Sequence, residues 1–446
     1  MQRIGWFALL VLQVLVVAGF WFWHHWHHPM GNQLLGDSAG QLIAWGRLAG
    51  LLVAFGCLLQ IVLIGRVRWV ERAFGLDRLT RLHHATGFSL VALLVAHPIL
   101  VTLGHARQDD VTVWAQLVDF IRTWTGLLTA AIGSLLLLVA VGLSVAIIRR
   151  RLRYETWYAT HLLIYIALAL AFLHQITVGS DLAGKPVFRA YWLALYAFAL
   201  LNLLGYRVVR PLWNFHRHRF FVDGVTPETS DVTSVYIRGR DLDRFRAEAG
   251  QFVLVRFLAP GFRWESHPFS ISQPPDGRQI RLTIKQLGDF TRRIPALPPG
   301  TPVIVDGPHG IFTAQRAQSP KVLLIAGGIG ITPIRSVAEV LLAAGREIVL
   351  IYGNRDRASV ALYGELERLV AGSSGRLRVA HVMSAEPGWP GEKGRVDGPC
   401  LARLAPDFQE RDIYLCGPPP MMRLVRAALL MAGVPKARVF DERFAL

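Results

Sequence analysis

Cysteine is scarce in this chain of 446 residues, and this excludes a fold held together by disulfide bonds. The three cysteines are Cys57, Cys400 and Cys416, and no two of them have the spacing of a disulfide framework or a cysteine-based metal site. We therefore expect the fold to depend on the packing of apolar residues, which make up 52% of the chain.

Acidic residues are also few. Asp and Glu number 31 against 48 Lys and Arg, so the formal net charge is +17. Such an excess is typical of proteins that bind nucleic acid or that meet an anionic membrane surface. The arginines stand largely at the ends of long apolar runs, where the inner leaflet attracts them. We therefore predict that the partner is membrane lipid, and we predict no nucleic-acid partner.

Charged residues are rare in six stretches of the first 209 residues. A hydrocarbon core about 30 Å thick requires roughly twenty apolar residues of helix. The stretches that meet this requirement are Ile4–Trp23, Gln41–Gly65, His83–Gly104, Trp124–Ile148, Thr156–Val178 and Arg189–Val208. The remaining sequence reads as an ordinary soluble α/β protein, so we predict a membrane half followed by a globular half.

The first stretch also has features of a signal peptide, because Arg3 precedes its apolar run. No small-residue cleavage site follows, however, and Trp21, Trp23 and Trp26 are typical of an aromatic belt at a membrane interface. We interpret it as a retained span.

Lys and Arg are enriched in alternate connections between the spans, which sets the orientation. The rich connections contain Arg66, Arg68, Arg72, Arg78 and Arg81, then Arg149, Arg150, Arg151 and Arg153, then Arg207, Arg210, Arg217 and Arg219. The intervening connections have few basic residues. The pattern predicts a multi-pass protein of a bacterial-type plasma membrane, with both termini and the globular half in the cytoplasm.

Histidines occur in pairs on two of the predicted spans. Ionisable residues at membrane depth are costly and are functional candidates by default. His83 and His97 on the third span are fourteen residues apart, which gives about 21 Å of rise and about 40° of rotation. His161 and His174 on the fifth span are separated by about 19.5 Å. Facing helices would offer an inner pair, His83 with His161, and an outer pair, His97 with His174, each suited to one haem iron.

Two details of this pairing stay open. The fifth-span histidines are about 140° apart on an ideal helix, so we expect that helix to be kinked or locally widened. His84 is an alternative to His83, but it lies about 140° from His97 and fits less well. No C-x-x-C-H sequence is present, so the haems are predicted to be b-type.

The paired spacing, His83-x13-His97 with His161-x12-His174, resembles the ferric reductase and NADPH oxidase family of transmembrane flavocytochromes b. The resemblance covers nearly the whole chain. It implies metal ligation by these four histidines and electron transfer across the membrane.

Two departures from the family pattern concern the electron acceptor. Arg47 falls where the superoxide-producing oxidases have an arginine near the outer haem. Val101, however, stands in place of their second histidine, and Ala167 replaces an aromatic residue that lies between the haems. Both differences weigh against oxygen as the physiological acceptor.

From Phe220 to about Phe312 the sequence alternates in strand fashion, which predicts a small antiparallel barrel. It contains His267-Pro268-Phe269-Ser270-Ile271-Ser272, then Lys285 and Gly288-Asp289-Phe290-Thr291. These motifs resemble the FAD-binding domain of the ferredoxin reductase superfamily. By this resemblance His267, Pro268, Phe269, Ser270 and Ser272 line the isoalloxazine, with Ser270 near its N5 atom. Lys285, Gly288, Phe290 and Thr291 would hold the diphosphate, and Asp306-Gly307-Pro308 would close the barrel.

From Lys321 onward the pattern changes to strand, glycine turn and helix. The strand Val322–Ala326 precedes Gly327-Gly328-Ile329-Gly330-Ile331-Thr332-Pro333, and a helix is predicted through Leu342. A glycine turn at this place lets the backbone approach a pyrophosphate. The G-G-x-G-x-T-P form resembles the same superfamily, which implies nicotinamide-dinucleotide binding by Gly327, Gly328, Gly330, Thr332 and Pro333.

Three further features concern the nicotinamide. Arg355 follows the strand Ile348–Tyr352 and is placed to bind a 2′-phosphate, although solvated loop arginines are equally common; we lean to NADPH over NADH. Cys416-Gly417-Pro418 follows the strand Ile413–Leu415 and resembles the superfamily motif whose thiol lies near the nicotinamide. Phe444 resembles the terminal aromatic that covers the flavin in this superfamily.

We therefore predict a multidomain protein. A six-helix transmembrane haem bundle (residues 1–212) precedes an antiparallel β-barrel FAD domain (213–315) and an α/β Rossmann-like nicotinamide domain (320–446). It would transfer electrons from cytosolic NAD(P)H, through FAD and two b haems, to external oxygen or a ferric chelate, with Ser270, Cys416 and Phe444 at the reacting atoms. No obligate protein partner is evident. Alternatives are an electron-supply module for a protein partner and a non-enzymatic membrane scaffold.

One cluster, His24-His25-Trp26-His27-His28, has no place in this scheme. It is either an interfacial cluster without a ligand role or an entrance that binds iron or copper on the acceptor side.

Overall fold

The computed structural model describes residues 2–28, 31–145, 154–179 and 181–443. The chain divides into two compact units. The first comprises Met1–Phe74 and Arg78–Leu204, and the second comprises Gly75–Asp77 and Gly205–Leu446. Each unit is described by itself.

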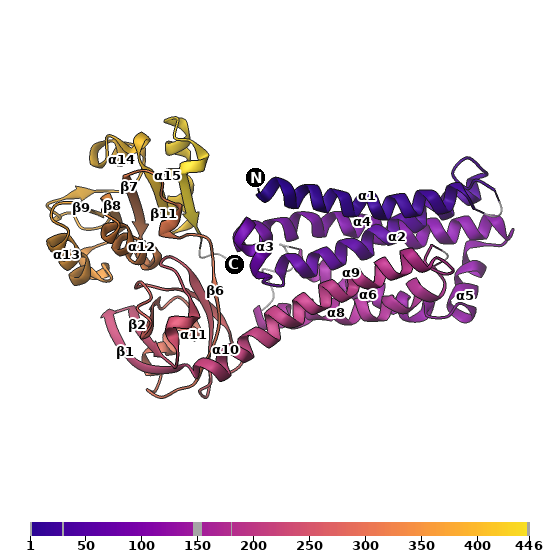
Figure 1. Cartoon of the computed structure of the whole chain (residues 1–446), viewed down its shortest axis with the longest axis horizontal. Helices are drawn as coiled ribbons and strands as arrows, with labels where there is room; N and C mark the ends of the chain where they lie inside the picture. Colours follow the sequence, from indigo (N-terminus) through magenta and orange to yellow (C-terminus); the bar gives the residue numbers. More distant parts are fainter. Residues whose placement is uncertain (1, 29–30, 146–153, 180, 444–446) are drawn as a thin grey trace. The chain divides into compact units, whose positions relative to one another are not determined.

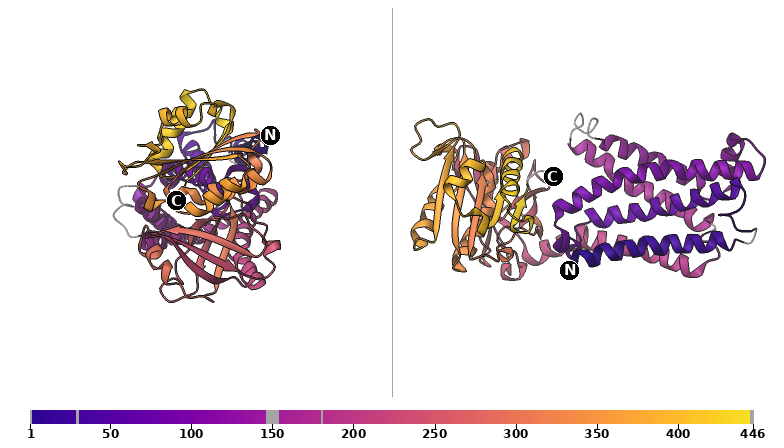
Figure 2. Two further views of the ribbon diagram at one scale, coloured as in Figure 1. Left: turned by 90° about the vertical axis from the view of Figure 1, so that its left-hand side faces the viewer. Right: turned by 90° about the horizontal axis from the view of Figure 1, so that it is seen from above.

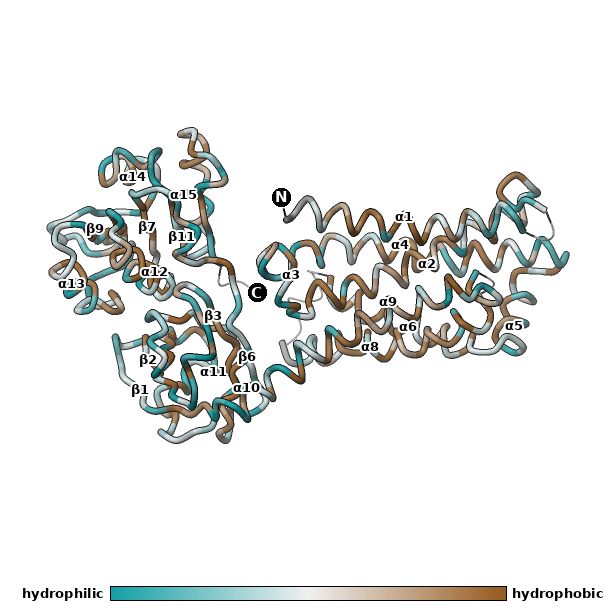
Figure 3. The backbone as a smooth tube through the Cα atoms, in the orientation of Figure 1, coloured by the Kyte–Doolittle hydropathy of each residue, from teal (hydrophilic) through white to brown (hydrophobic). Residues whose placement is uncertain are grey.

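The first unit is a bundle of helices that run alongside one another (Figures 1 and 2). Its elements are α1 (Gln2–Trp26), α2 (Ser38–Ile64), α3 (Arg68–Phe74), α4 (Leu76–Gln108), α5 (Val113–Thr123), α6 (Leu127–Ser144), α8 (Tyr154–Thr177) and α9 (Pro186–Leu204). Six helical stretches of the described residues are long and apolar enough to cross a membrane, and each overlaps one of the six predicted spans. Apolar residues dominate along these helices (Figure 3).

Close approaches at small residues hold the bundle together. A Cβ atom at Gly46 of α2 would lie 2.8 Å from Val101 Cγ2 of α4, and one at Gly133 of α6 would lie 2.6 Å from the Ala167 carbonyl oxygen of α8. Glycine therefore allows these helices to approach closely, as is common inside membranes. On another side of the bundle, the Trp21 indole of α1 donates a 2.8 Å hydrogen bond to the Ala44 carbonyl of α2.

The expected widening of the fifth span is not found. All residues of α8 from Tyr154 to Thr177 are α-helical, and no wider turn interrupts them. Its two histidines nevertheless meet their partners, because two rotatable side-chain bonds separate each imidazole ring from the backbone and absorb the difference in direction.

The second unit begins with a π-helical turn (Gly205–Val209) and α10 (Arg210–His218). Two three-stranded antiparallel sheets follow. One has the order β1 (Phe221–Thr229), β2 (Val232–Arg238), β5 (Gln279–Lys285), and the other has the order β4 (His267–Ser270), β3 (Phe252–Phe257), β6 (Val303–His309). Isolated bridges, Phe221 to Pro302 and Ile271 to Leu282, link the two sheets around one apolar core. The short helix α11 (Asp289–Arg293) follows β5.

The rest of the second unit is a six-stranded parallel sheet with helices. Its strands are β7 (Lys321–Gly327), β8 (Glu347–Asn354), β9 (Leu377–Met383), β10 (Glu392–Lys393), β11 (Asp412–Cys416) and β12 (Val439–Glu442). The helices are α12 (Ile331–Ala343), α13 (Tyr363–Gly372), α14 (Gly398–Leu404) and α15 (Pro419–Met431). The strand order is β10-β9-β8-β7-β11-β12, so the direction of winding reverses between β7 and β11. Ligands of open α/β sheets bind at such a switch point.

Candidate functional site

The four intramembrane histidines lie in two pairs between α4 and α8. The ring centroids of His83 and His161 are 6.2 Å apart, and those of His97 and His174 are 6.3 Å apart. His84 is exposed, and its ring lies beside His83 at 5.8 Å. The structure thus brings together the two pairs that the sequence predicts.

Two imidazoles that bind one metal ion from opposite sides require a definite spacing. Metal–nitrogen bonds to histidine measure about 2.0–2.1 Å, and the ring centroid lies roughly 1.1 Å behind the nitrogen, so the two centroids are about 6.2–6.4 Å apart. Both observed spacings agree with this distance. The donor set therefore fits two irons: His83 and His161 would hold one, and His97 and His174 would hold the other, such as the irons of two b-type haems.

The surroundings of His97 fix its tautomer. Its Nδ1 atom lies 2.8 Å from the Gly46 carbonyl oxygen. A carbonyl only accepts, so Nδ1 carries the proton and Nε2 keeps the lone pair that a metal needs. Gly50 makes room for the ring, because a Cβ atom there would lie 2.7 Å from His97.

A small network fixes the tautomer of His161 in the same way. The Ser144 hydroxyl donates to the Ala140 carbonyl at 2.8 Å, so its oxygen is left to accept. It accepts from the Trp157 indole at 3.1 Å and lies 3.1 Å from His161 Nδ1. His161 Nδ1 is therefore the donor, and Nε2 is available as a ligand.

A cavity of about 450 Å³ surrounds the outer pair, His97 and His174. This volume is within the range of about 300–1,000 Å³ that is usual for ligand pockets, and the lining is mostly apolar. Arg47, Val101 and Ala167, the residues that bear on the choice of acceptor, all line it. Arg47 Nη1 is buried without a hydrogen-bond partner among the described residues.

In the parallel sheet, two turns meet at the switch point between β7 and β11. A Cβ atom at Gly330 would lie 2.8 Å from the Gly417 nitrogen, and one at Gly327 would lie 2.8 Å from Pro418 Cδ. Within the first of these turns, Gly328 has a φ of +48°, a backbone conformation that glycine adopts readily. The two predicted nicotinamide motifs therefore form one site, although about ninety residues separate them.

Cys416 ends β11 and is fully buried. Burial raises the pKa of its thiol well above the usual range, so the thiol stays protonated at neutral pH. Nearby, the Thr332 hydroxyl donates to the Ile329 carbonyl at 3.0 Å, and Pro333 is buried in the first turn of α12. The hydrogen bond and the buried proline stabilise the glycine turn where it leads into α12.

The predicted flavin residues gather at β4 and α11. The His267 and Phe290 rings lie 4.0 Å apart, and Phe269 stacks on Phe290 at 6.4 Å. Pro268 and Ser270 pair with Leu254 and Phe252 of β3.

The predicted diphosphate residues have partners of their own. The Thr291 hydroxyl oxygen accepts from the Leu287 and Gly288 nitrogens at 2.8 and 3.0 Å. Lys285 Nζ lies 3.2 Å from Asp231 Oδ2. The Thr291 contacts order the turn before α11.

A buried polar network that the sequence did not predict joins the sheets of the second unit. Arg281 of β5 pairs with Glu365 of α13 and donates to the Ser272 carbonyl at 2.9 Å. Arg335 of α12 pairs with the same carboxylate at 2.9 Å. Ser272, predicted to line the flavin, is fully buried in this network. No sequence pattern pointed to Arg281 or Glu365, because 84 residues separate them.

One predicted residue is exposed, and others lie outside the described residues. Arg355 is exposed in the loop after β8. Phe444 lies outside the described residues, as do Arg149, Arg150, Arg151 and Arg153 of the fourth connection.

Three protein families match successive parts of the chain. "Ferric reductase like transmembrane component" matches residues 49–172, "FAD-binding domain" matches residues 224–311, and "Oxidoreductase NAD-binding domain" matches residues 324–427. The first match contains His83, His97 and His161, and His174 lies two residues beyond its end. The other two contain the flavin motifs and the two turns at the switch point.

Two curated relatives each match about half of the chain. The ferredoxin reductase component of 3-ketosteroid-9-alpha-monooxygenase from Mycolicibacterium smegmatis is 32% identical over 231 residues, 49% of this chain and 63% of that protein. Its counterpart from Rhodococcus rhodochrous is 30% identical over 236 residues, 50% of this chain and 64% of that protein. The chain thus covers less than two thirds of either relative. Among solved structures, the FAD/NAD-binding domain of nitric oxide dioxygenase from Vibrio cholerae is 23% identical, with a TM-score of 0.45, over 51% of this chain and 98% of that domain.

Proposed function

This chain has the architecture of the ferric reductase and NADPH oxidase family, with a ferredoxin-reductase-like module, and from this premise we propose a route for its electrons. They pass from NAD(P)H through FAD and two b-type haems to an acceptor on the opposite face of the membrane. The observation that carries the proposal is the spacing of the two histidine pairs, 6.2 and 6.3 Å, each of which fits one iron.

In this proposal the four histidines hold the haems, and their neighbours orient them. The Gly46 carbonyl and the Ser144 hydroxyl oxygen each accept a hydrogen bond from an Nδ1–H group, so that the lone pair of Nε2 would face the metal. When bound, FAD converts the hydride of NAD(P)H into single electrons and the haems conduct these across the membrane.

The second unit positions the nicotinamide at the switch point of its parallel sheet. The glycine turn from Gly327 to Gly330 brings backbone close to the pyrophosphate, and the neutral Cys416 thiol adjoins that turn. Arg355 is exposed and free to meet a 2′-phosphate, which favours NADPH over NADH. Ser270 and Phe444 act at the flavin, and both termini lie in the cytoplasm.

The acceptor is oxygen or a ferric chelate. Purified protein assayed with each acceptor and each nicotinamide tests the proposal. We expect NADPH-dependent reduction of at least one acceptor and a Soret band that shifts when NADPH is added without oxygen. A purified protein that has no Soret band would contradict the proposal.

A second candidate is electron supply to a protein partner. Two relatives that match about half of the chain are named as ferredoxin reductase components of a monooxygenase. A chain that reduces its haems with NADPH but turns over neither small acceptor would favour this candidate.

A further inference from the structure

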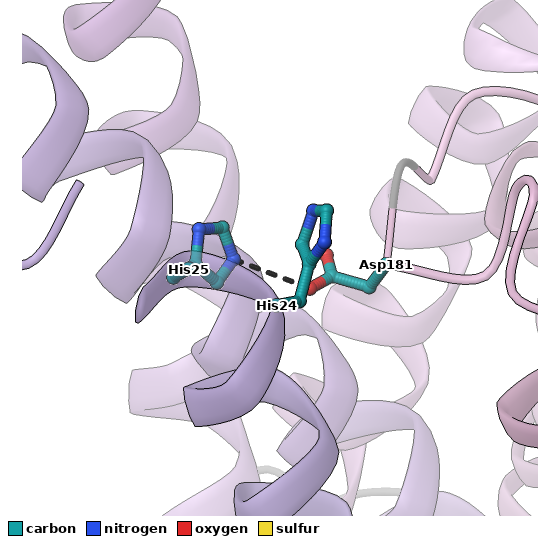
Figure 4. Close-up of side chains that lie close together, drawn as sticks. All are labelled: His24, His25 and Asp181. Atoms are coloured by element: carbon teal, nitrogen blue, oxygen red, sulfur yellow. Dashed lines mark ion pairs between the residues drawn. The ribbon is translucent and has the colours of Figure 1, made fainter. Parts of the chain in front are cut away.

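Two histidines and an aspartate from distant parts of the sequence meet at one end of the helical bundle. His24 and His25 belong to the last turn of α1, and Asp181 lies in the connection between α8 and α9. Figure 4 shows the three side chains close together. One ligand atom from each lies within 4.8 Å of the others, and all three residues are buried. We call them the His24–His25–Asp181 cluster.

The hydrogen bonding of His25 prepares its outer nitrogen for a cation. His25 is fully buried, and its Nδ1 atom lies 2.6 Å from Gln33 Oε1. With Nδ1 as donor to this oxygen, a neutral ring presents the lone pair of Nε2 on its other side. That atom lies 3.2 Å from Asp181 Oδ1. Two electron-pair donors thus face each other at a distance that an ion bound to both would bridge.

The distances suit a small transition-metal ion. Bonds of about 2.0–2.2 Å to nitrogen and oxygen place neighbouring ligands roughly 3–3.5 Å apart. His25 and Asp181 already have this spacing. The His24 ring lies 4.9 Å from the His25 ring, so a small rotation brings its nitrogen to the same ion. Two imidazoles and one carboxylate are a donor set for iron, copper or zinc rather than for calcium or magnesium.

The cluster also adjoins the cavity of the outer histidine pair. Asp181 lines that cavity together with His97 and His174. The end of α1 further favours a cation, because the carbonyl groups of a final helical turn carry partial negative charge.

We propose that His24, His25 and Asp181 bind a first-row transition-metal ion and that ionic iron or copper reaches the outer haem site through them. The role of these ions as electron acceptors rests on the function proposed above, and it makes ionic iron or copper the substrate class. Each ferric ion takes one electron and leaves as Fe(II), so one NAD(P)H, releasing NAD(P)⁺ and a proton, serves two ions. The sequence predicted a metal-binding entrance formed by His24–His28. The proposed site includes only His24 and His25 of these histidines, and Asp181 is its third ligand.

Zinc is the probe for the site, because it binds without redox chemistry. Full-length protein in detergent is dialysed against Zn²⁺ and the bound metal is measured by elemental analysis. We expect the variant H24Q/H25Q/D181N to lose one zinc per chain relative to the wild type. The matched control is H27Q, since His27 is exposed and its Nδ1 atom lies 3.1 Å from the Trp23 carbonyl oxygen of α1. It should bind zinc as the wild type does.

Two further variants guard against misfolding. H24Q leaves the buried His25–Asp181 contact in place and should still weaken zinc binding. Q33L removes the group that orients His25 and should lower zinc affinity roughly 10–100-fold, as is usual for the partners of metal ligands. Haem content and thermal stability of each variant show whether it is folded. Equal zinc binding by wild type, H24Q and the triple variant would overturn the site and would mean that His25 and Asp181 form a plain ion pair.

The link to substrate is measured separately. The variant H24Q, whose changed residue is not among those lining the outer cavity, should have a higher KM for ferric citrate and an unchanged rate with oxygen. An unchanged KM for ferric citrate would overturn the entrance role. The metal site and the proposed function can fail separately. A wild-type protein that binds zinc but reduces neither acceptor would contradict the proposed function and leave the metal site standing.

Discussion

The placement of a few protons determines what the membrane histidines can bind. His97 donates through Nδ1 to the Gly46 carbonyl, and His161 donates through Nδ1 to the Ser144 oxygen. Both therefore present Nε2 to their partners on the facing helix. The sequence indicates which histidines pair, but the groups that orient them lie on other helices and carry no recognisable motif.

Ser144 supplies the first prediction. In S144A the His161 Nδ1–H group loses the Ser144 oxygen as its acceptor, and a buried donor left unsatisfied costs about 1–3 kcal/mol. We expect the inner haem to be bound more weakly and its low-spin EPR signal to change, with the outer signal unchanged. S144T keeps the hydroxyl and serves as the control. Identical spectra for S144A and wild type would show that this network does not orient His161.

At the scale of elements, buried ion pairs hold α12 and α13 to β5. Glu365 lies between Arg281 and Arg335, and its side chain is 18% exposed. Burial acts to raise its pKa, but the Arg281 hydrogen bond and the charges of both arginines outweigh burial, so the pKa is below the usual 4.5. A lowered carboxyl pKa stabilises the fold above pH 4.5, and this stabilisation is lost as the pH falls further.

E365Q should destabilise the second unit by about 3 kcal/mol at pH 7, because the buried Arg281 guanidinium loses its carboxylate partner, while Arg335 still pairs with Glu339. The difference from wild type should shrink as the pH falls below 4.5, where Glu365 itself becomes protonated. Thermal unfolding of both proteins across this pH range provides the measurement. E410Q removes an exposed carboxylate near Lys321 and should unfold like the wild type. A difference that is independent of pH would show that the charge of Glu365 does not matter.

The glycine turn at the switch point gives a second prediction at this scale. G330A places a Cβ atom 2.8 Å from the Gly417 nitrogen, so the two turns must separate. We expect nicotinamide affinity to fall roughly tenfold or more, with FAD content unchanged. G372A, at the end of α13 with open space around it, is the matched control. If G330A bound NADPH as tightly as G372A does, the nicotinamide would not lie at this turn.

The sequence predicts most elements but not their contacts. The six spans follow from apolar runs, although α4 begins at Leu76, seven residues before the predicted start. The short helix α5 was not predicted, since its eleven residues have no long apolar run. Asp181 could not be joined to His24 and His25, because only tertiary packing of α1 against the later helices brings them together. Periodicity reports which face of an element is buried, whereas side-chain partners depend on how elements are arranged.

At the scale of the whole molecule, one chain combines two kinds of site. The first unit holds paired histidines in an apolar bundle, and the second holds a switch point suited to a dinucleotide. The family matches run in the same order along the chain. This combination supports NAD(P)H-driven electron transfer by a multi-pass membrane protein.

The most direct test counts haem in purified protein and then adds NADPH without oxygen. The account predicts two b-type haems per chain by pyridine haemochrome, both reduced by NADPH. H97L and H174L should each retain one haem, which NADPH still reduces, because the inner pair is intact. Two haems in either variant, or haems that NADPH leaves oxidised in the wild type, would contradict it.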